Sequence, residues 1–532
     1  MADTTDNIAL VREAAPITSA TELNRLLDEA ALRRPVSWVR DLEETRLQYE
    51  GHVQELLKQA VRQRYQGTGA RMPLMPFEWV SLVAFKGSTI YDTPTTRQLM
   101  RGGESVDEET PAAQAFQQMI DESQIESLMP EFDRVRYVSK SAVLYVYSDS
   151  VAAMVSKKPP KTKAMIVWPT DLYPIVNPAA PTNLQACTRL LWRTGQASGS
   201  SDTSYMDWRR STTMDTNGNI IAYGPWQADL VVITRKARAW GRVDESVRVT
   251  PVWAPYPFTR LPFVVAHKRE PTASPFATGA GAIKDVANSI NTSIASELLT
   301  VDMTAAPVLV KKSSRPSPAS TVLGPGIMVT LLPEESLESV TQTSDLAGIR
   351  TTNAAMLENL ALTERQRPGS FTGNDGAESG VALKIKSLPA EKARREDKMR
   401  MRSFEEEELL PTMIEIHDYF RQTRIAAAHD RVSVDFPDPP DFESRPERQT
   451  RLAEAVNEGW IDKARAAVEA GYYATLEEAK VEIARLATEK EARMSSALMG
   501  SNAISERSDD GDSASQDAAG TSGDANADDE LA

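Results

Sequence analysis

A glycine-rich loop that runs directly into a long helical stretch decides the fold. Pro368-Gly-Ser-Phe-Thr-Gly-Asn-Asp-Gly-Ala-Glu-Ser-Gly380 is followed by Val381-Ala-Leu-Lys-Ile-Lys-Ser-Leu388. The first segment is typical of a loop because Gly, Pro, Ser and Asn favour turns. In the helical stretch after it only Pro389 and Pro411 interrupt the pattern, and a proline inside a helix often kinks it. We therefore expect a kinked helix of about 42 residues, roughly 60 Å long.

Two more helices precede this loop and bracket a short β segment. Apolar residues recur every three or four positions over 281–304 and again over 344–366, which predicts two amphipathic helices. Between them we expect strands at Val308-Leu-Val310 and at 326–332. The loop that joins these strands begins with a compact basic group made of Lys311, Lys312 and Arg315. In one copy such a group is an ordinary solvated loop, but around a ring it would form a basic collar able to meet phosphates or an acidic partner.

The N-terminal half predicts helices followed by β structure. Helical periodicity over 21–64 is split by Pro35. Between 135 and 269, short runs rich in β-branched and aromatic residues predict strands. These runs are 143–147, 164–168, 184–192, 230–234 and 261–266. Asn217-Gly218 is a typical hairpin turn. The fold class is therefore α+β, mainly helical.

The C-terminal part predicts a rigid linker, short helices and a disordered tail. The linker is Asp435-Phe-Pro-Asp-Pro-Pro440, and Gly459 ends the first helix after it. Asp462 caps the next helix, and Thr475 with Glu478 forms a capping box for the last. From Ser495 onward the Ser, Ala, Gly and Asp composition does not build a core.

The size and charge of the chain limit what it does. At 532 residues it should contain about three or four compact units. The net charge is −15, of which nine acids and one base between Ser501 and Ala532 contribute −8, leaving −7 for the first 500 residues. An acidic chain does not coat DNA by bulk charge, so any contact with nucleic acid is expected to be local.

Cysteine usage and the N-terminus point to a soluble intracellular protein. Cys187, the only cysteine, has no intrachain partner for a disulfide, and no Cys/His cluster suggests zinc. The first residues form no signal peptide, and no apolar run approaches the ~18 residues of a membrane span. We expect no membrane association.

The motifs that carry enzyme chemistry are not found, so we expect no enzyme, no cofactor, no catalytic residue and no metal. Gly279-Ala-Gly281 has the wrong spacing for a phosphate-binding loop, and Ser198 and Ser379 are each displaced from the nucleophile-elbow pattern. Asp215-x-Asn217-x-Asn219 begins like a calcium loop but lacks its later ligands. Glu405-Glu-Glu-Glu408 is either a cation site or a solvated helix face, and we expect the solvated face. The four histidines are scattered and are expected to be structural: His52, His267, His417 and His429.

One stretch of the chain resembles a known family. Glu378-Ser-Gly-Val-Ala-Leu-Lys384, running into Ala390-Glu-Lys-Ala-Arg-Arg395, resembles the segment with which portal proteins of tailed bacteriophages leave their tunnel loop and begin a long kinked helix. These portals are the head-to-tail connectors of the SPP-one type. Weaker echoes follow the family's order at 256–265, 282–291 and 435–462. The resemblance covers about 130–500 and is strongest over 375–400.

The resemblance implies a portal-like subunit with an α/β wing, a two-helix stem, a small β clip and a helical crown, assembled as a ring. The implied parts are wing 1–276, stem helix 277–304, clip 305–343, second stem helix 344–367, tunnel loop 368–380, long kinked wing helix 381–425, crown 426–496 and disordered acidic tail 497–532. The basic group Lys311, Lys312 and Arg315 would then dock a motor or adaptor. The implied tunnel loop includes Pro368, Gly369, Phe371, Gly373, Asn374, Asp375, Gly376, Glu378, Ser379 and Gly380.

The resemblance also implies partners and a place. Portals of this kind form dodecameric rings at one capsid vertex, through which double-stranded DNA is packaged by the terminase large subunit and later ejected. They bind head-tail adaptor, major capsid and scaffolding proteins, and they pass DNA without sequence specificity. The implied location is the virion, with the host cytoplasm during assembly.

This chain departs from a DNA-gripping loop, and two other functions stay open. The loop contains Asp375 and Glu378 but no Lys or Arg, so contact with DNA there would be steric or through the flanking Arg365 and Arg367. The alternative to a portal is an intracellular scaffold or adaptor that uses long helices for hetero-oligomers without a channel. An enzyme with a site built from scattered carboxylates is the third possibility, but no pair of acids has a telling spacing.

Overall fold

The chain is described from a computed structural model, which divides into two compact units, Met1–Pro439 and Pro440–Ala532. The residues described are 10–32, 34, 36–64, 74–150, 154, 157–196, 202–215, 220–237, 243–279, 281–305, 308–312, 336–340, 346–367, 369–372, 380–425, 430–437, 445–458, 461–469, 479–486 and 488.

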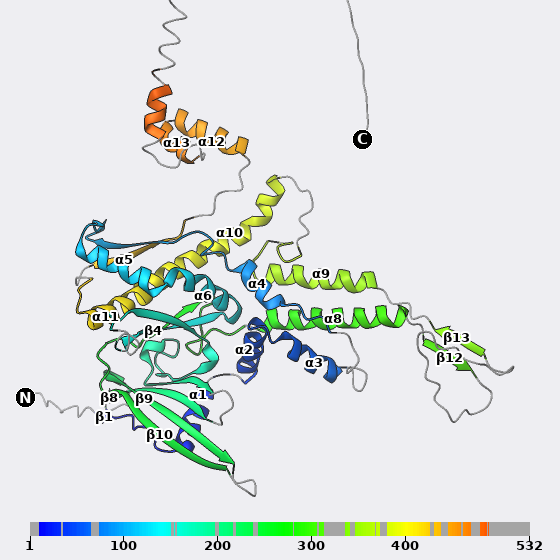
Figure 1. Ribbon diagram of the computed structural model, residues 1–532, viewed down its shortest axis with the longest axis horizontal. Helices are drawn as coiled ribbons and strands as arrows, with labels where there is room; N and C mark the ends of the chain where they lie inside the picture. The colour runs from blue at the N-terminus through cyan, green and yellow to red at the C-terminus, as the bar shows by residue number, and fades with distance from the viewer. Residues whose placement is uncertain are drawn as a thin grey trace, which may run out of the picture. The chain divides into compact units, whose positions relative to one another are not determined.

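The first unit is α+β, with antiparallel sheets and helices packed around them (Figure 1). Its helices are α1 (Ala20–Ala31), α2 (Val36–Tyr49), α3 (Val53–Arg64), α4 (Trp79–Gly87), α5 (Pro111–Ser123), α6 (Ile125–Ser139), α8 (Gly281–Ala305), α9 (Leu346–Thr363), α10 (Gly380–Ser403) and α11 (Leu410–Arg421). The predicted helices over 21–64, 281–304 and 344–366 are therefore confirmed, with boundaries that differ by a few residues.

The strands form four separate sheets. The largest has the order β10-β9-β8-β7-β6, with β1 paired to β8. Two three-stranded sheets have the orders β11-β4-β5 and β14-β2-β3, and β12 pairs with β13. The strands are β1 (Leu10–Arg12), β2 (Thr96–Arg101), β3 (Glu104–Ser105), β4 (Ser141–Ser148), β5 (Thr162–Val167), β6 (Leu172–Ile175), β7 (Arg189–Gln196), β8 (Thr203–Met214), β9 (Ile220–Ala237), β10 (Val243–Trp253), β11 (Phe263–His267), β12 (Val308–Lys312), β13 (Ser336–Val340) and β14 (Asp430–Asp435).

Most of the predicted strands are confirmed. Four of the five runs predicted over 135–269 lie on β4, β5, β9 and β11, while in the run 184–192 the strand starts only at Arg189, after a short 3₁₀ turn. The predicted turn Asn217-Gly218 lies outside the described residues, but the strands on either side of it pair antiparallel up to Met214 and Ile220. Strand β14 was not predicted; it pairs along the whole of β2 and belongs to the first unit.

The core of the first unit is centred on β4. Residues Ser141–Leu144 are buried because β11 and β5 flank the strand and the helices α6 and α11 pack on it. Large aromatic side chains fill the surrounding space, including Phe132, Phe263 and Trp208. Burial of apolar area on this scale is the main stabilising term of the unit.

The long helix after the glycine-rich loop is present, and it contains a π-helical turn. Helix α10 is followed by the π turn η5 (Phe404–Leu409) and then by α11. Pro411 has no N–H, so it leaves the carbonyl of Glu407 without its usual helical donor. Arg260 Nη1 donates to that carbonyl at 2.7 Å. The predicted disturbance at Pro411 is therefore a π turn whose exposed acceptor is satisfied by a side chain from another segment.

A cluster of three buried charges and one half-buried charge, Lys268, attaches α10 to the body of the unit. Asp397 on α10 accepts a hydrogen bond from Arg136 of α6 at 3.2 Å and another from Lys268, which follows β11. Arg136 also pairs with Asp133, at 2.6 Å. We call Asp133, Arg136, Lys268 and Asp397 the anchor cluster. Burial acts to raise the pKa of Asp397, but the two cations outweigh it and the pKa is lowered.

The described residues of the second unit form short helices. They are α12 (Arg445–Asn457), α13 (Lys463–Glu469) and a helical stretch over 479–486. Helix α13 begins directly after Asp462, as its predicted cap position requires. The predicted stop at Gly459, the capping box at Thr475 and Glu478, and the acidic tail lie outside the described residues.

The anchor cluster predicts a large loss of stability when Asp397 is replaced. Asp397→Ala leaves the buried Arg136 with Asp133 as its one remaining carboxylate partner in the cluster, and it removes the carboxylate that pairs with Lys268. The substitution should lower the free energy of unfolding by about 3 kcal/mol. Glu396→Ala is the matched control, because the neighbouring Glu396 makes an exposed pair with Arg365 and should cost under about 1 kcal/mol. Urea unfolding of both variants measures the difference, and equal losses would contradict the role given to the cluster.

Candidate functional site

The first half of α8 is fixed firmly to the body of the unit by polar contacts. Lys284 Nζ lies 2.8 Å from a carboxylate oxygen of Asp41 and 3.0 Å from one of Glu44, both on α2. One turn further on, Gln48 donates to Asn288 at 2.9 Å. These contacts hold the N-terminal half of α8 against α2.

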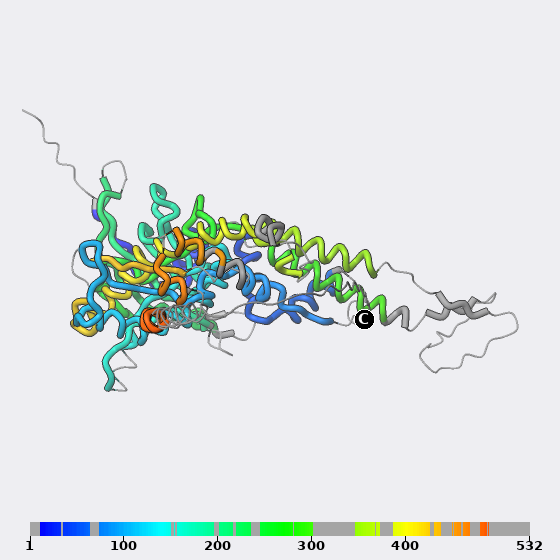
Figure 2. Tube along the Cα trace, turned by 90° about the horizontal axis from the view of Figure 1, so that it is seen from above, coloured from blue at the N-terminus to red at the C-terminus, as the bar shows by residue number. Residues whose placement is uncertain are grey.

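Further along α8, the contacts come from α3, α4 and α9. The Asn291 side chain exchanges two hydrogen bonds with the backbone of Phe77, just before α4. Ala295 is fully buried in a small cluster with Leu57 and Val61 of α3. Helix α9 lies alongside α8, and α3 and α4 lie along the other flank of α8 (Figure 2).

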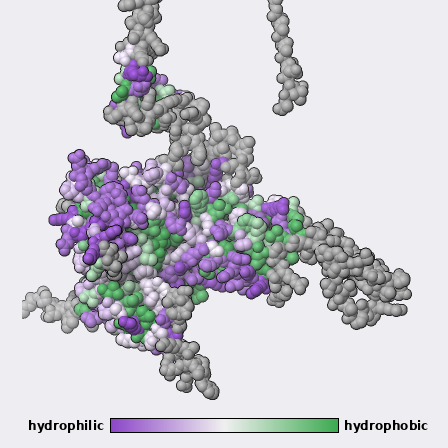
Figure 3. Space-filling view, viewed as in Figure 1, coloured by the Kyte–Doolittle hydropathy of each residue, from purple (hydrophilic) through white to green (hydrophobic). Residues whose placement is uncertain are grey.

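Helix α9 is only partly covered within one chain. Leu357, Leu360 and Ala361 are buried, whereas most of the residues from Leu346 to Ala355 are exposed or half-buried. Arg350 Nε donates to Glu297 of α8 at 2.7 Å, near the end of the pair that is farther from the body. Figure 3 shows hydrophobic surface gathered over the region where α4, α8 and α9 meet.

The β hairpin between α8 and α9 carries part of the predicted basic group. Strands β12 and β13 pair antiparallel, with Lys311 opposite Leu337 and Lys312 opposite Ser336. The strand predicted at Val308 is confirmed, and its partner β13 was not predicted. Arg315 and the strand expected over 326–332 lie outside the described residues.

The predicted loop after α9 is attached to the body at its first half. Lys140 Nζ lies 2.7 Å from Glu364, at the end of α9, and Arg365 pairs with Glu396 of α10 at 3.1 Å. Phe371 is 6% exposed and belongs to the main core. Arg365, expected to flank a DNA contact, therefore has a carboxylate partner, and Phe371 is a core residue.

Some of the other residues predicted for the loop over 368–380 are described, and others lie outside the described residues. Gly369 has φ +84°, a left-handed conformation that favours glycine. Gly380 is the first residue of α10. Pro368, Gly373, Asn374, Asp375, Gly376, Glu378 and Ser379 lie outside the described residues. Arg367 is described and is half-buried.

The acidic run in η5 is only in part the solvated face that we expected: Glu407 and Glu408 are exposed, whereas Glu405 is buried and Glu406 is half-buried. Glu405 is fully buried and accepts from Arg97 Nε at 2.7 Å and from the Tyr91 hydroxyl at 2.5 Å. Glu406 accepts a hydrogen bond from the backbone N–H of Val434 at 2.7 Å. The solvated-face interpretation is wrong at Glu405, because the run itself does not show that a buried arginine from a distant segment pairs with this residue. Among the described residues, no group of three or more His, Cys, Asp or Glu side chains is placed to hold a metal ion.

Cys187, His267 and His417, which were considered as candidates for chemistry, are buried or half-buried within the fold. Cys187 is fully buried, and burial raises the pKa of its thiol to about 12, which makes it a poor nucleophile. His267 lies 2.9 Å from Ser141 Oγ, and burial lowers the pKa of its ring to about 4. His417 is 2% exposed and lies on α11, while His429 is outside the described residues. In the part of the chain that is described, no helix is long and apolar enough to cross a membrane.

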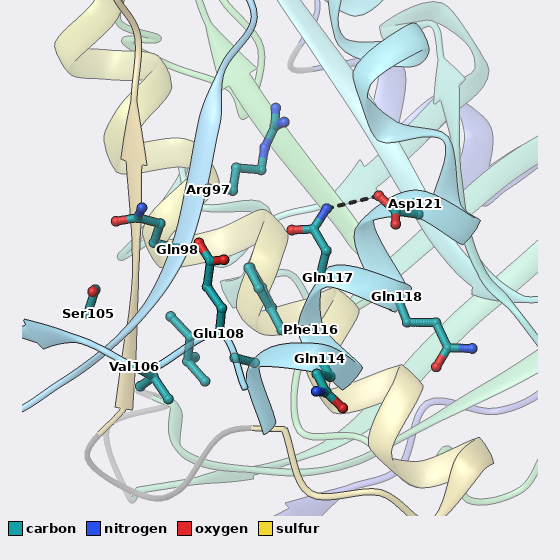
Figure 4. A pocket seen from close by; sticks show the side chains of 12 residues that line it. Arg97, Gln98, Ser105, Val106, Glu108, Gln114, Phe116, Gln117, Gln118 and Asp121 are labelled. Carbon is teal, nitrogen blue, oxygen red and sulfur yellow. Dashed lines mark hydrogen bonds between the residues drawn. The ribbon is translucent and has the colours of Figure 1, made fainter. Parts of the chain in front are cut away.

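A surface hollow of about 520 Å³ lies between β2 and α5 (Figure 4). Amide side chains dominate its lining, including Gln98, Gln114 and Gln117. Gln117 donates to Asp121 at 2.9 Å within the same helix. The lining also includes Arg97, Ser105, Glu108 and Asp121, and it contains no histidine, cysteine or lysine.

Comparison with known proteins gives only distant structural neighbours. No family model and no curated protein matches the chain. Among solved structures, a chain from the neck of a native GTA particle, determined with C12 symmetry, is 11% identical with a TM-score of 0.36, over 74% of this chain and 89% of that chain. A chain from the neck of an empty GTA particle, determined with C6 symmetry, is 12% identical with a TM-score of 0.34, over 78% and 92%.

A third neighbour comes from the virion of a native gene transfer agent (GTA) particle, at 12% identity and a TM-score of 0.32, over 78% of this chain and 98% of that chain. Similarity at this level decides neither the fold nor the function of this chain.

The buried His267 predicts a pH-dependent stability. Its ring is neutral in the folded chain down to about pH 4, but it binds a proton near pH 6.5 once unfolded. The unfolded state therefore gains protons first, and stability falls as the pH drops from about 6.5 toward 4. We expect this residue to cost about 2 kcal/mol between pH 7 and pH 5.

Urea unfolding at the two pH values measures this loss. His267→Gln should show a smaller decrease than the wild-type chain, while the exposed His52→Gln should match the wild type. Equal decreases in all three proteins would show that His267 does not carry the effect.

Proposed function

We propose that this chain is the subunit of a phage-type portal: a non-enzymatic ring through which double-stranded DNA is packaged by a separate terminase motor and later ejected. The observation that carries the proposal is the order of parts from α8 to α11. A helix, a β hairpin, a returning helix, an anchored loop and a long interrupted helix follow one another. This is the order implied by the sequence resemblance at Glu378–Arg395.

The uncovered part of the α8–α9 pair supports a ring. Within one chain α9 buries mainly its last turns, and its earlier residues are exposed or half-buried although α8 lies beside them. An amphipathic or apolar helix gains stability when its remaining apolar surface is packed. Copies of the same pair, side by side around an axis, provide such packing in a closed form. We propose a ring of about a dozen subunits.

The remaining parts are assigned by the same proposal. The hairpin β12–β13 with Lys311 and Lys312, together with Arg315, would be the docking tip for the motor and the head-tail adaptors. The loop over 368–380 would face the channel. Major capsid and scaffolding proteins would contact the rest of the ring, which would reside in the virion after assembly in the host cytoplasm. A hetero-oligomeric scaffold without a channel is the alternative, and it requires no pore.

Imaging of the purified full-length chain tests the proposal directly. Negative-stain electron microscopy should show rings of about a dozen subunits with a central pore wide enough for a DNA duplex, because only a portal needs such a pore. Mass photometry of the same sample should give one dominant ring mass. A chain that stays monomeric at high concentration and several salt concentrations would refute the portal, and closed particles without a pore would favour the scaffold.

The attachment of the loop allows its channel role to be tested apart from folding. Deleting 373–377 removes residues beyond the buried Phe371 and should leave ring assembly intact, while lowering the DNase-protected DNA per particle. Phe371→Ala is the contrasting variant, because it empties a core position and should lower the free energy of unfolding by about 3 kcal/mol. Unchanged DNA content and infectious yield after the deletion would remove the role given to this loop.

A further inference from the structure

The outer surface of α4 is apolar although α4 is a surface helix. Val80, Val83 and Ala84 pack into the core. On the opposite side Leu82 is 38% exposed and Phe85 is 60% exposed. A helix that is apolar on all sides is normally covered on all sides. One flank of this helix is therefore uncovered in the single chain.

The uncovered surface extends into the segment before α4. Met75 is 51% exposed and Phe77 is 40% exposed, and the Phe77 ring lies 6.0 Å from that of Trp79. The indole N–H of Trp79 is shielded from solvent and has no hydrogen-bond partner within the described residues. Several exposed apolar side chains on one short segment, with an unsatisfied donor beside them, are typical of a protein–protein contact. We call Met75, Phe77, Leu82, Phe85 and Lys86 the α4 face.

The same chain has a second uncovered surface on α9. Residues 354, 358 and 362 follow one another at helical spacing and are exposed, and Leu362 is 59% exposed. The face consists of Thr351, Ala354, Ala355, Glu358 and Leu362, and we call it the α9 face. It is mostly small or apolar and carries one acidic residue, whereas the α4 face carries one basic residue, Lys86.

The two faces lie on different flanks of α8 and run in the same direction. Figure 2 shows α3 and α4 along one flank and α9 along the other. Helix α4 runs from Phe77, held by Asn291 of α8, to Ser88, which donates to Asp133 of α6 at 2.6 Å.

Helix α9 likewise runs from Arg350, paired with Glu297 of α8, to Glu364, paired with Lys140 after α6. Rotation about a ring axis parallel to α8 preserves the height and the direction of every helix. The α4 face of one copy and the α9 face of the next would therefore meet in parallel at a similar height.

We propose that the α4 face binds the α9 face of a second copy of this chain, with Lys86 opposite Glu358. This inference rests on the proposed ring and names its subunit contact. The contact is heterologous, because each copy uses its α4 face toward one neighbour and its α9 face toward the other. Such contacts form a closed ring when the rotation between neighbours adds up to a full turn. The apolar side chains cover one another, and the Lys86–Glu358 pair fixes the register and excludes two like faces from pairing.

Cysteine cross-linking of the full-length chain tests the pairing. The double variant Lys86→Cys, Glu358→Cys should give a ladder of covalent oligomers up to the ring size under mild oxidation. Each single variant should give no ladder, because like faces do not meet. The buried Cys187 contributes no background. Glu29→Cys with Glu358→Cys is the control, since Glu29 lies on α1 away from both faces.

Charge reversal gives an independent measurement. Lys86→Glu and Glu358→Lys should each raise several-fold the concentration below which rings dissociate, and the combined reversal should restore the wild-type value. Dimers from a single-cysteine variant would overturn the inference in favour of a symmetric contact. Porous rings without a ladder in the double-cysteine variant would overturn this contact alone, whereas wild-type chain that forms no ring would overturn the proposed function.

Discussion

The attachment of α10 to the body depends on the balance of buried charge in the anchor cluster. Asp133 and Asp397 face Arg136 and Lys268, so two carboxylates meet two cations. Taking any of these groups out of water is costly unless the others are present. The cluster joins α6, the segment after β11 and α10 at one place. A slip of one residue along α10 would turn Asp397 by about 100° away from its partners, so the cluster also fixes the register of the long helix.

The π turn η5 follows from the same requirement. Asp397 fixes α10 on one side, while α11 buries Leu410 and Met413 in the core on the other. Two anchored segments of one helix need not agree in phase, and a π turn adds one residue to absorb the difference. The turn is stabilised from outside at successive residues, since Arg97 holds Glu405, the backbone of Val434 holds Glu406 and Arg260 satisfies the carbonyl of Glu407. An irregular turn that is held this way is part of the fold.

Sequence patterns predicted the elements whose signal is local. The helices α8 and α9 follow from apolar spacing, and β4 and β11 from β-branched and aromatic runs. The interactions that hold α10 and η5 were not predictable, because Arg97 and Glu405 are 308 positions apart and Arg136 and Asp397 are 261 apart. A run of four glutamates does not show that one of them pairs with a buried arginine. The strand β14 was missed for a related reason, since its partner β2 precedes it by more than 300 residues.

The candidate site contains one part that is fixed to the body of the unit and two helix faces that are exposed in a single chain. The first half of α8 is fixed by Lys284 and Asn291, whereas the α4 and α9 faces on its two flanks have no cover in one chain. The apolar periodicity over 344–366 predicts α9. The α4 face went unrecognised, since an apolar run such as Trp79–Phe85 looks like ordinary core until its burial is known.

The net negative charge of the chain is consistent with the proposed ring. The first 500 residues carry −7 per copy, and repetition around a ring multiplies that value. Like charge repels DNA only within about 10 Å of a surface at 0.1 M salt. A channel formed by such copies would keep DNA from settling on its wall without needing any specific contact. In the proposed ring, the apolar faces would lie between subunits, and the net negative charge of the copies would act on the DNA in the channel.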